Sequence, residues 1–273
     1  MVIVKEYRIP LPLTVEEFRK GQLYAVAECS KNETGGGEGA EFVKQEEFES
    51  DELLAGTTLK GTYTYKIYRL RSKAPWVLQK ALPVEAFEVH EESWNAYPYC
   101  KTVITNPGYM KENMSLIIES IHLPDDGSSE NPLNAGKREI IHVDICADEI
   151  LHKKDYHEAS DPKIFRSEKI QRGPVGKDWL KRAETPVMCA YKLVSLNFKW
   201  TGLTHFVEKT IQKQYPRIFS KLHREAYCWL DRWIDLSMEE IRELEERTAE
   251  ELRRQLIEEA KRGSCCDETR STA

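Results

Sequence analysis

The run from Trp94 to Cys100 combines side chains that can hydrogen-bond or react within one short segment. It consists of Trp-Asn-Ala-Tyr-Pro-Tyr-Cys, which places the amide of Asn95 and the thiol of Cys100 among three aromatic rings. Alternating aromatic and small residues indicate a half-buried strand, in which Asn95 and Cys100 would face opposite sides. A bulge or bend at Pro98 would bring both side chains into one interior. The alternative is an aromatic-rich strand that binds nothing.

The segment from Lys31 to Gly39 contains three consecutive glycines, which first suggest a loop that binds phosphate through its backbone amides. It lacks the Gly-Lys-Ser/Thr ending of a P-loop, no helix pattern follows it, and two glutamates within it would repel phosphate. We therefore interpret it as the exit of a helix and the approach to a hairpin.

Hydrolytic chemistry has little support in the sequence. The chain contains no G-x-S-x-G elbow, and its seven histidines form no HExxH or other compact ligand set. His142 is the best candidate for a general base, although an ordinary sheet residue is the simpler interpretation. A lipid hydrolase or another acyl-transfer enzyme is therefore kept only as an alternative, and we expect neither catalytic residues nor a metal site.

Composition excludes several classes of protein. A length of 273 residues allows one large domain or two small ones, and the net charge of -6 argues against a nucleic-acid binder that works through a global basic field. Seven cysteines without a CxxC pair indicate reduced thiols. No stretch approaches the apolar length of a spanning helix and no signal peptide is evident, so we expect a soluble, cytoplasmic protein. Cys265 and Cys266 lie in a polar tail that is either disordered or acylated.

Two capping boxes mark helices near the two ends of the chain. Thr14 and Glu17 open a helix to about Ser30, with Gln22 on its apolar side, and Ser237 and Glu240 open a second helix to about residue 261. An earlier helical region, 203–236, contains Pro216, which should kink or break it. Strand patterns occupy residues 2–10, 62–68, 86–99, 102–105, 116–123, 139–145 and 190–199.

Two other segments stand apart from these elements. The short run from Ala74 to Leu82 is apolar nearly all round, which suggests contact with a membrane or a partner. Residues 147–188 are polar and charged, and they should wrap the body of the protein without forming its core.

Several runs, in order and in register, resemble the small single-domain (class I) phosphatidylinositol transfer proteins over residues 1–262. The matching runs are 31–39, 94–100, 172–174, 188–194 and 228–231. The resemblance implies an α+β, START-like helix-grip fold, in which long helices and a curved, mainly antiparallel sheet enclose one lipid. The C-terminal helix would serve as a lid, and residues 263–273 would form a disordered polar tail.

The resemblance also implies which residues bind the lipid. Thr64 and Lys66 are two apart on one strand and so face the same side; without the resemblance they would be an ordinary solvent-facing pair. The residues that match inositol-headgroup ligands are Thr64, Lys66, Asn95 and Glu245. Those that match the phosphate end or the cavity wall are Gln22, Tyr68, Cys100, Thr102, Ser120 and Lys192.

The chain departs from the family pattern at three places. Trp200 is followed by Thr201 where mammalian members have a second tryptophan at a membrane-inserting loop, so we expect Trp76 to supplement Trp200 in membrane contact. The loop from Ser50 to Gly61 looks longer than usual, and the loop after Pro124 differs. Ser167 matches a serine that is phosphorylated in relatives, although a plain surface serine is an equal alternative.

The function implied is exchange of phosphatidylinositol and phosphatidylcholine between membranes without chemical change. Each buried methylene is worth about 0.8 kcal/mol, so moving a diacyl lipid into water would cost on the order of 20 kcal/mol, and a carrier must replace the bilayer. We expect a monomer that touches membrane surfaces transiently and carries phospholipid as cargo, with no cofactor. A lipid sensor that presents phosphatidylinositol to a lipid kinase would need the same pocket.

Overall fold

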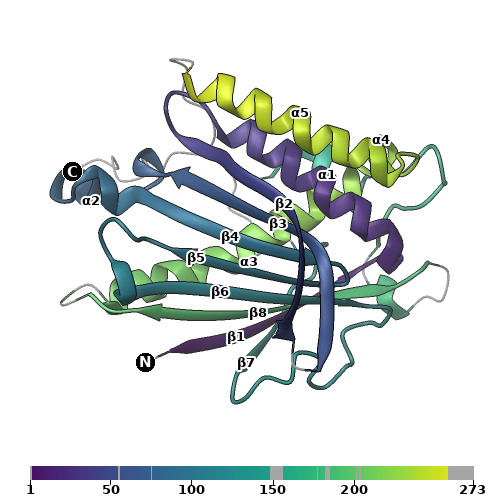
Figure 1. Cartoon of the computed structure of the whole chain (residues 1–273). Coiled ribbons are helices and arrows are strands. Elements are labelled where there is room, and N and C mark those ends of the chain that lie inside the picture. The colour runs from purple at the N-terminus through teal and green to yellow at the C-terminus, as the bar shows by residue number, and fades with distance from the viewer. Residues whose placement is uncertain are drawn as a thin grey trace, which may run out of the picture.

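The computed structural model describes residues 2–54, 56–74, 76–147, 156–176, 178–181, 185–200, 202 and 204–257. Its centre is one twisted, eight-stranded sheet with the order β2-β3-β4-β5-β6-β8-β1-β7 (Figure 1). The strands are β1 (Ile3–Leu11), β2 (Gly39–Leu54), β3 (Thr57–Arg69), β4 (Glu88–Ala96), β5 (Tyr99–Thr105), β6 (Met114–Leu123), β7 (Glu139–His142) and β8 (Met188–Phe198). Neighbouring strands are antiparallel except β1 and β7, which are parallel. The predicted α+β helix-grip architecture is confirmed.

Helices cover one face and one end of this sheet. They are α1 (Val15–Glu33), α2 (Trp76–Ala81), α3 (Thr204–Cys228), α4 (Leu230–Trp233) and α5 (Met238–Ile257). In Figure 1, α1 and α5 lie side by side and α3 crosses behind the central strands. None of the described helices is both long and apolar enough to cross a bilayer.

Local capping chemistry sets the helix starts as predicted. The Glu17 amide donates to Thr14 Oγ1 at 3.1 Å, and the Thr14 amide donates to Glu17 Oε2 at 2.7 Å. Ser237 and Glu240 repeat the arrangement at 3.1 and 2.8 Å before α5. Each pair satisfies two backbone donors that the first helical turn leaves unpaired. In contrast, α3 continues through Pro216, so of the two predicted outcomes at this proline, a kink or a break, the break does not occur.

The prediction of one continuous strand over residues 86–99 is wrong, because the structure has two strands there. β4 ends at Ala96, the chain turns at Tyr97 and Pro98 through a cis peptide bond, and β5 begins at Tyr99. The predicted bend near Pro98 is confirmed, because Asn95 and Cys100 are direct partners across this hairpin. A proline cannot donate to a sheet ladder, and here it occupies the turn.

The segment from Ser50 to Gly61 is not a long loop. β2 continues to Leu54 and β3 starts at Thr57, so this segment is the end of a long hairpin. β2 forms one edge of the sheet, and its charged residues, including Glu46, Glu47 and Glu49, suit an edge that must not pair with another chain.

The described parts of residues 147–188 hold only one-turn 3-10 helices, Glu158–Ser160 and Trp179–Lys181. The expectation that this stretch stays out of the core is nevertheless wrong, because Val175 and Trp179 are buried within the main hydrophobic cluster. The same cluster includes Tyr7, Leu11 and Met188 from the sheet and Trp233 from α4. A Cβ added to Gly21 of α1 would lie 2.8 Å from the Trp233 ring, so glycine permits the close approach of α1 and α4.

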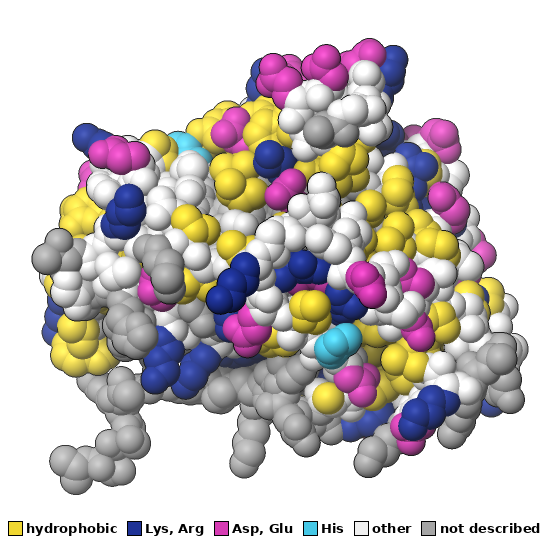
Figure 2. Space-filling model, turned by 90° about the horizontal axis from the view of Figure 1, so that it is seen from below, with side chains coloured by type: hydrophobic (Ala, Val, Ile, Leu, Met, Phe, Trp, Pro, Cys, Tyr) yellow, Lys and Arg dark blue, Asp and Glu magenta, His cyan; other side chains and the backbone are white. Residues whose placement is uncertain are grey.

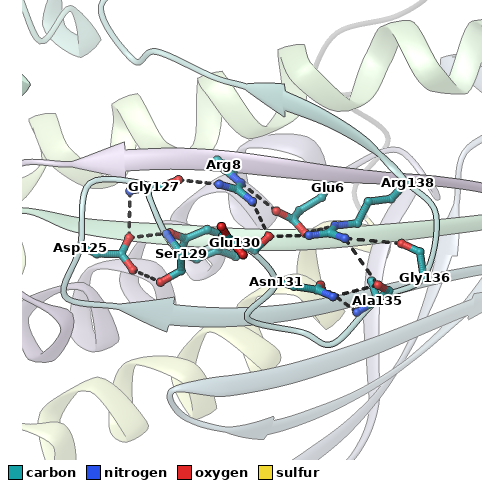
Figure 3. A network of polar contacts seen from close by, with 11 residues as sticks. Glu6, Arg8, Asp125, Gly127, Ser129, Glu130, Asn131, Ala135, Gly136 and Arg138 are labelled. Carbon is teal, nitrogen blue, oxygen red and sulfur yellow. Dashed lines mark hydrogen bonds and ion pairs between the residues drawn. The ribbon is translucent and has the colours of Figure 1, made fainter.

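A network of charged and polar groups fixes the loop after Pro124 to the outer face of β1 (Figure 3). Arg8 donates to Glu6 at 2.8 Å, to the Gly127 carbonyl at 2.7 Å and to the Glu130 carbonyl at 2.9 Å. Arg138 binds the other oxygen of Glu6 and also the Glu130 carbonyl. The two guanidinium groups therefore share one buried carboxylate and anchor the loop.

The lower face of the protein carries mixed charge. Figure 2 shows basic and acidic side chains interspersed among apolar ones, without a continuous basic area among the described residues. This mixed distribution accords with the net charge of -6.

Candidate functional site

The register of the sheet places the sequence-predicted residues in rows on one face. Asn95, Cys100, Ser120 and Lys192 are consecutive cross-strand partners on β4, β5, β6 and β8. Thr64 and Thr102 flank Ser93 in the next row, and Lys66 pairs with Glu91 in the row after that. Directly opposed residues project from the same face of a sheet. We call this face the concave face.

Helices cover the concave face. The first row continues from Lys192 to Tyr7 of β1, whose ring meets the Phe219 ring of α3 edge-on, with 5.1 Å between the ring centres. From α1, Gln22 hydrogen-bonds to the Cys100 thiol. From α5, Arg242 donates to Thr62 Oγ1 at 3.1 Å, beside Asn95 in the register. The structure thus brings the predicted residues of the strands, of α1 and of α5 together on the concave face, beneath the helices that cover it.

Lys66 is the centre of the end predicted to bind the headgroup. Its ammonium lies 3.6 Å from Glu91 Oε1 and 4.5 Å from the centre of the Phe42 ring, and the residue is 6% exposed. Glu245 of α5 interacts electrostatically with it; burial raises the pKa of this carboxyl, and the positive charge of Lys66 opposes that rise. Two carboxylates therefore face one ammonium.

The residues around Lys66 supply neutral hydrogen-bonding groups. The Tyr68 hydroxyl donates to Glu91 Oε1 at 3.4 Å, and burial raises its pKa. The Ser93 and Thr102 hydroxyls are 3.0 Å apart. Asn95 Oδ1 accepts the Cys100 thiol at 3.1 Å, which leaves the Asn95 amide nitrogen available to donate.

Lys192 dominates the end predicted to hold the phosphate. Its ammonium is 3.5 Å from Ser120 Oγ and 5.5 Å from the Phe219 ring centre, and burial lowers its pKa. No carboxylate in the described parts of the chain forms an ion pair with it. The Cys100 thiol nearby is neutral at physiological pH, since burial raises its pKa to about 11.

Two histidines that the sequence did not single out lie beside Lys192. His122 Nδ1 is 3.0 Å from the Pro98 carbonyl, and His223 Nδ1 is 2.7 Å from the Phe219 carbonyl. Carbonyls only accept, so both Nδ1 atoms carry hydrogen and both Nε2 atoms are acceptors. Neither buried Nε2 has a hydrogen-bond partner among the described residues. Burial, and then the charge of Lys192, lowers the pKa of both, that of His223 to about 3.

A sequence signal for these histidines existed but was weak. His122 is two residues from Ser120 on one strand, which puts both on the same face, while His223 is one helical turn from Phe219. His142, the general-base candidate, instead lies exposed on the edge strand β7, opposite Arg8 in register. It takes no part in the concave face.

The glycine segment after α1 forms a turn, as predicted. Gly35 and Glu38 make an isolated bridge, and Gly37 and Gly39 have positive φ values of 78° and 117°. A Cβ on Gly39 would lie 2.4 Å from Thr34 Oγ1. The Gly37 amide donates to the Leu256 carbonyl at 3.0 Å, so this turn holds the far end of α5.

The residues predicted to contact membranes lie at one end of the molecule. Trp76 of α2 is 49% exposed. Trp200, which follows β8, is half-buried, and its ring centre lies 5.8 Å from that of Tyr109. Figure 1 places α2 and the end of β8 at the same end of the sheet. Thr201, Cys265, Cys266 and the predicted tail at 263–273 are outside the described residues.

Ser167 is not a surface serine. It is fully buried, and its hydroxyl binds Asp231, which also accepts the Glu168 amide at 2.8 Å. Phosphorylation of Ser167 stays a prediction, and it would require this contact to open.

Comparison with known proteins agrees with these features. The family model described as phosphatidylinositol transfer protein matches residues 2–250. The chain is 48% identical over 261 residues to the phosphatidylinositol transfer protein beta isoforms of Rattus norvegicus and Homo sapiens, covering 92% of this chain and 94% of each relative. It is 40% identical over 262 residues to phosphatidylinositol transfer protein 1 of Dictyostelium discoideum, covering 94% of this chain and 97% of that protein. The chain therefore belongs to the phosphatidylinositol transfer protein family.

Proposed function

We propose that this protein encloses one phosphatidylinositol or phosphatidylcholine molecule on its concave face and exchanges it between membranes without altering it chemically. The observation that carries this proposal is Lys192, a buried ammonium whose only described polar neighbour within hydrogen-bonding distance is the Ser120 hydroxyl. A buried cation is costly unless it is paired. A lipid phosphate would supply the missing anion.

The accessibility of the concave face supports an enclosed ligand. Tyr68, Cys100 and Lys192 are only half-buried by area, although burial is the first cause of the pKa shift of each. Side chains that line an enclosed space combine these two properties. The pairing of an ammonium and a phosphate about 4 Å apart is worth roughly 4 kcal/mol at an effective dielectric near 20, before desolvation.

The rest of the concave face suits acyl chains. The row that begins with Lys66 and Glu91 continues through the apolar partners Ile104, Leu116 and Leu196, and the row that contains Thr102 continues through Ile118 and Val194. A carrier must replace the apolar environment of the bilayer, because each methylene moved into water costs about 0.8 kcal/mol.

The headgroup end suits inositol. We assign Thr64, Asn95 and Glu245 to hydrogen bonds with the hydroxyls of the inositol ring. Lys66 would also contact the inositol headgroup. Gln22, Cys100, Thr102 and Ser120 would contact the phosphate and glycerol region, which both lipids share. This division predicts that the phosphate end serves both lipids, whereas the hydrogen bonds to ring hydroxyls at the headgroup end serve phosphatidylinositol.

Release of the lipid requires the helices that cover the concave face to move away from it. α5 is tied to the sheet by the bond from Arg242 to Thr62 and to the glycine turn by the bond from Gly37 to Leu256. We propose that the protein works as a cytoplasmic monomer, that Trp76 and Trp200 meet the membrane surface, and that α5 moves there to admit and release lipid.

The test is transfer of labelled lipids between vesicles. Lys192→Met should reduce transfer of both lipids at least tenfold, whereas Thr64→Glu and Lys66→Ala should reduce phosphatidylinositol transfer alone. Lys101→Met is the matched control, because Lys101 lies between Cys100 and Thr102 on β5 and projects from the opposite face. Normal phosphatidylinositol transfer by all three variants would contradict the site, and consumption of lipid by the wild type would contradict the carrier.

A further inference from the structure

The headgroup end contains one acidic residue that the proposed roles do not use. Glu91 lies directly opposite Lys66 in the register, and its side chain is 15% exposed. It accepts the Tyr68 hydroxyl at 3.4 Å and lies 3.6 Å from the Lys66 ammonium. Both contacts point it toward the interior, because Lys66 and Tyr68 share the concave face.

We propose that Glu91 selects lipid headgroups by charge, favouring hydroxyl-rich and cationic headgroups over one that carries an additional phosphate. This inference rests on the proposed function of the site.

Two acidic groups and one ammonium meet at the headgroup end. Around the Lys66 ammonium stand two carboxylates, Glu91 from β4 and Glu245 from α5. At the exposed rim, Arg242 and Glu246 act on Glu245 with opposite signs. Lys192, a second buried ammonium on this face, lies four strands farther along the sheet. Glu91 therefore already matches the charge of the Lys66 ammonium, and Glu245 is a further acidic group beside this pair.

The acidic groups at the headgroup end act differently on different lipid headgroups. Inositol hydroxyls are donors, and a carboxylate with free lone pairs accepts them. The quaternary ammonium of choline is attracted to negative charge. A phosphate on the inositol ring brings up to two further negative charges, and the Lys66 ammonium already faces Glu91. A ring phosphate and the Glu91 carboxylate are both negative, and like charges close together in a half-buried site repel strongly.

Glu92 provides a matched control. It is the next residue on β4, carries the same charge, and faces the other side of the sheet, where it accepts the Tyr63 hydroxyl at 2.9 Å. Glu91→Gln and Glu92→Gln therefore make the same change in net charge, but only the first makes it inside the headgroup end.

The experiment measures capture of phosphatidylinositol, phosphatidylcholine and phosphatidylinositol 4-phosphate from vesicles of otherwise equal composition. Wild type should prefer phosphatidylinositol over its 4-phosphate at least tenfold. Glu91→Gln should raise capture of the 4-phosphate about tenfold and lower that of phosphatidylcholine severalfold. Phosphatidylinositol capture should change less than about threefold, because the Gln amide oxygen still accepts hydroxyls. Glu92→Gln should leave the 4-phosphate excluded.

Equal capture of phosphatidylinositol and its 4-phosphate by wild type would overturn the proposal, even if the Glu91 variant did not fold. Unchanged lipid ratios in folded Glu91→Gln, or the same gain in Glu92→Gln, would also overturn it. If wild type captured neither phosphatidylinositol nor phosphatidylcholine, the proposed function itself would fail, which separates the two failures.

Discussion

Glu6 and Arg8 on the outer face of β1 and Lys192 on the concave face of β8 are all charges withdrawn from water, but their partners differ. The outer carboxylate binds two guanidinium groups, and Arg8 also binds two carbonyls (Figure 3). Close by, Asp125 accepts the Tyr191 hydroxyl at 2.6 Å and the Ser129 hydroxyl at 2.6 Å. Lys192 has a single hydroxyl at 3.5 Å.

This contrast separates structure from function. On the outer face, Glu6, Arg8 and Arg138 match one another's charges, so the network holds the loop after Pro124 in place. On the concave face, Lys192 and the Nε2 atoms of His122 and His223 keep unused hydrogen-bonding capacity. Unmatched buried polar groups are costly, so their persistence points to a ligand.

The largest effect should come from breaking the outer network. Glu6→Gln would leave two buried guanidinium groups without their shared carboxylate, and we expect it to lower the free energy of unfolding by about 3–5 kcal/mol. Urea denaturation measures this. A loss below about 1 kcal/mol would show that the outer network is no more structural than the concave face.

Lys192→Met should have the opposite profile. Removing a desolvated, unmatched ammonium should leave the free energy of unfolding unchanged or raise it by about 1 kcal/mol, while transfer of both lipids falls. Stability and transfer are measured on the same lipid-free preparation. A large loss of stability would mean that Lys192 belongs to the fold and not to a ligand site.

The buried histidines of the concave face should make the stability of the protein depend on pH. His223 has a pKa lowered to about 3 in the folded chain, against 6.5 ordinarily. The unfolded state therefore binds the proton first as pH falls, and stability is lost between pH 6.5 and 3. The loss should be about 2 kcal/mol by pH 5. His223→Gln should flatten this dependence, while His142→Gln, on the exposed edge strand, should not.

The smallest effect concerns α5. Thr248 is buried, and its hydroxyl has no hydrogen-bond partner among the described residues. Thr248→Val should raise the free energy of unfolding by about 1 kcal/mol, since it removes an unsatisfied polar atom at nearly constant volume. If α5 must move to release lipid, vesicle transfer should slow about twofold. Faster transfer would contradict a moving α5.

Local chemistry made much of the fold predictable. The capping boxes at Thr14 and Ser237 fix helix starts with donors and acceptors only three residues apart, and both were predicted. β6 (Met114–Leu123) and β8 (Met188–Phe198) also lie close to the strands predicted over 116–123 and 190–199. The resemblance to the family supplied the candidate ligands, and the sheet brings those on its strands onto one face.

Long-range features were not predictable in the same way. Glu91, His122 and His223 are ordinary residues in the sequence, and the burial of Ser167 depends on Asp231, which is 64 positions away. The turn at Pro98 was predicted only as a bend, because its strands are paired by tertiary contacts. Periodicity describes one element at a time, and it does not say which elements become neighbours.

The sequence by itself determined the helix caps, the strand patterns, and which side chains share a face within one strand, such as Thr64 and Lys66. Only the tertiary structure decided that Lys192 is enclosed while Lys101 faces the other way, and that Lys66 meets two carboxylates from separate elements. The reason is physical: alternation is a property of the local backbone, whereas burial and charge pairing depend on the register of strands distant in the chain.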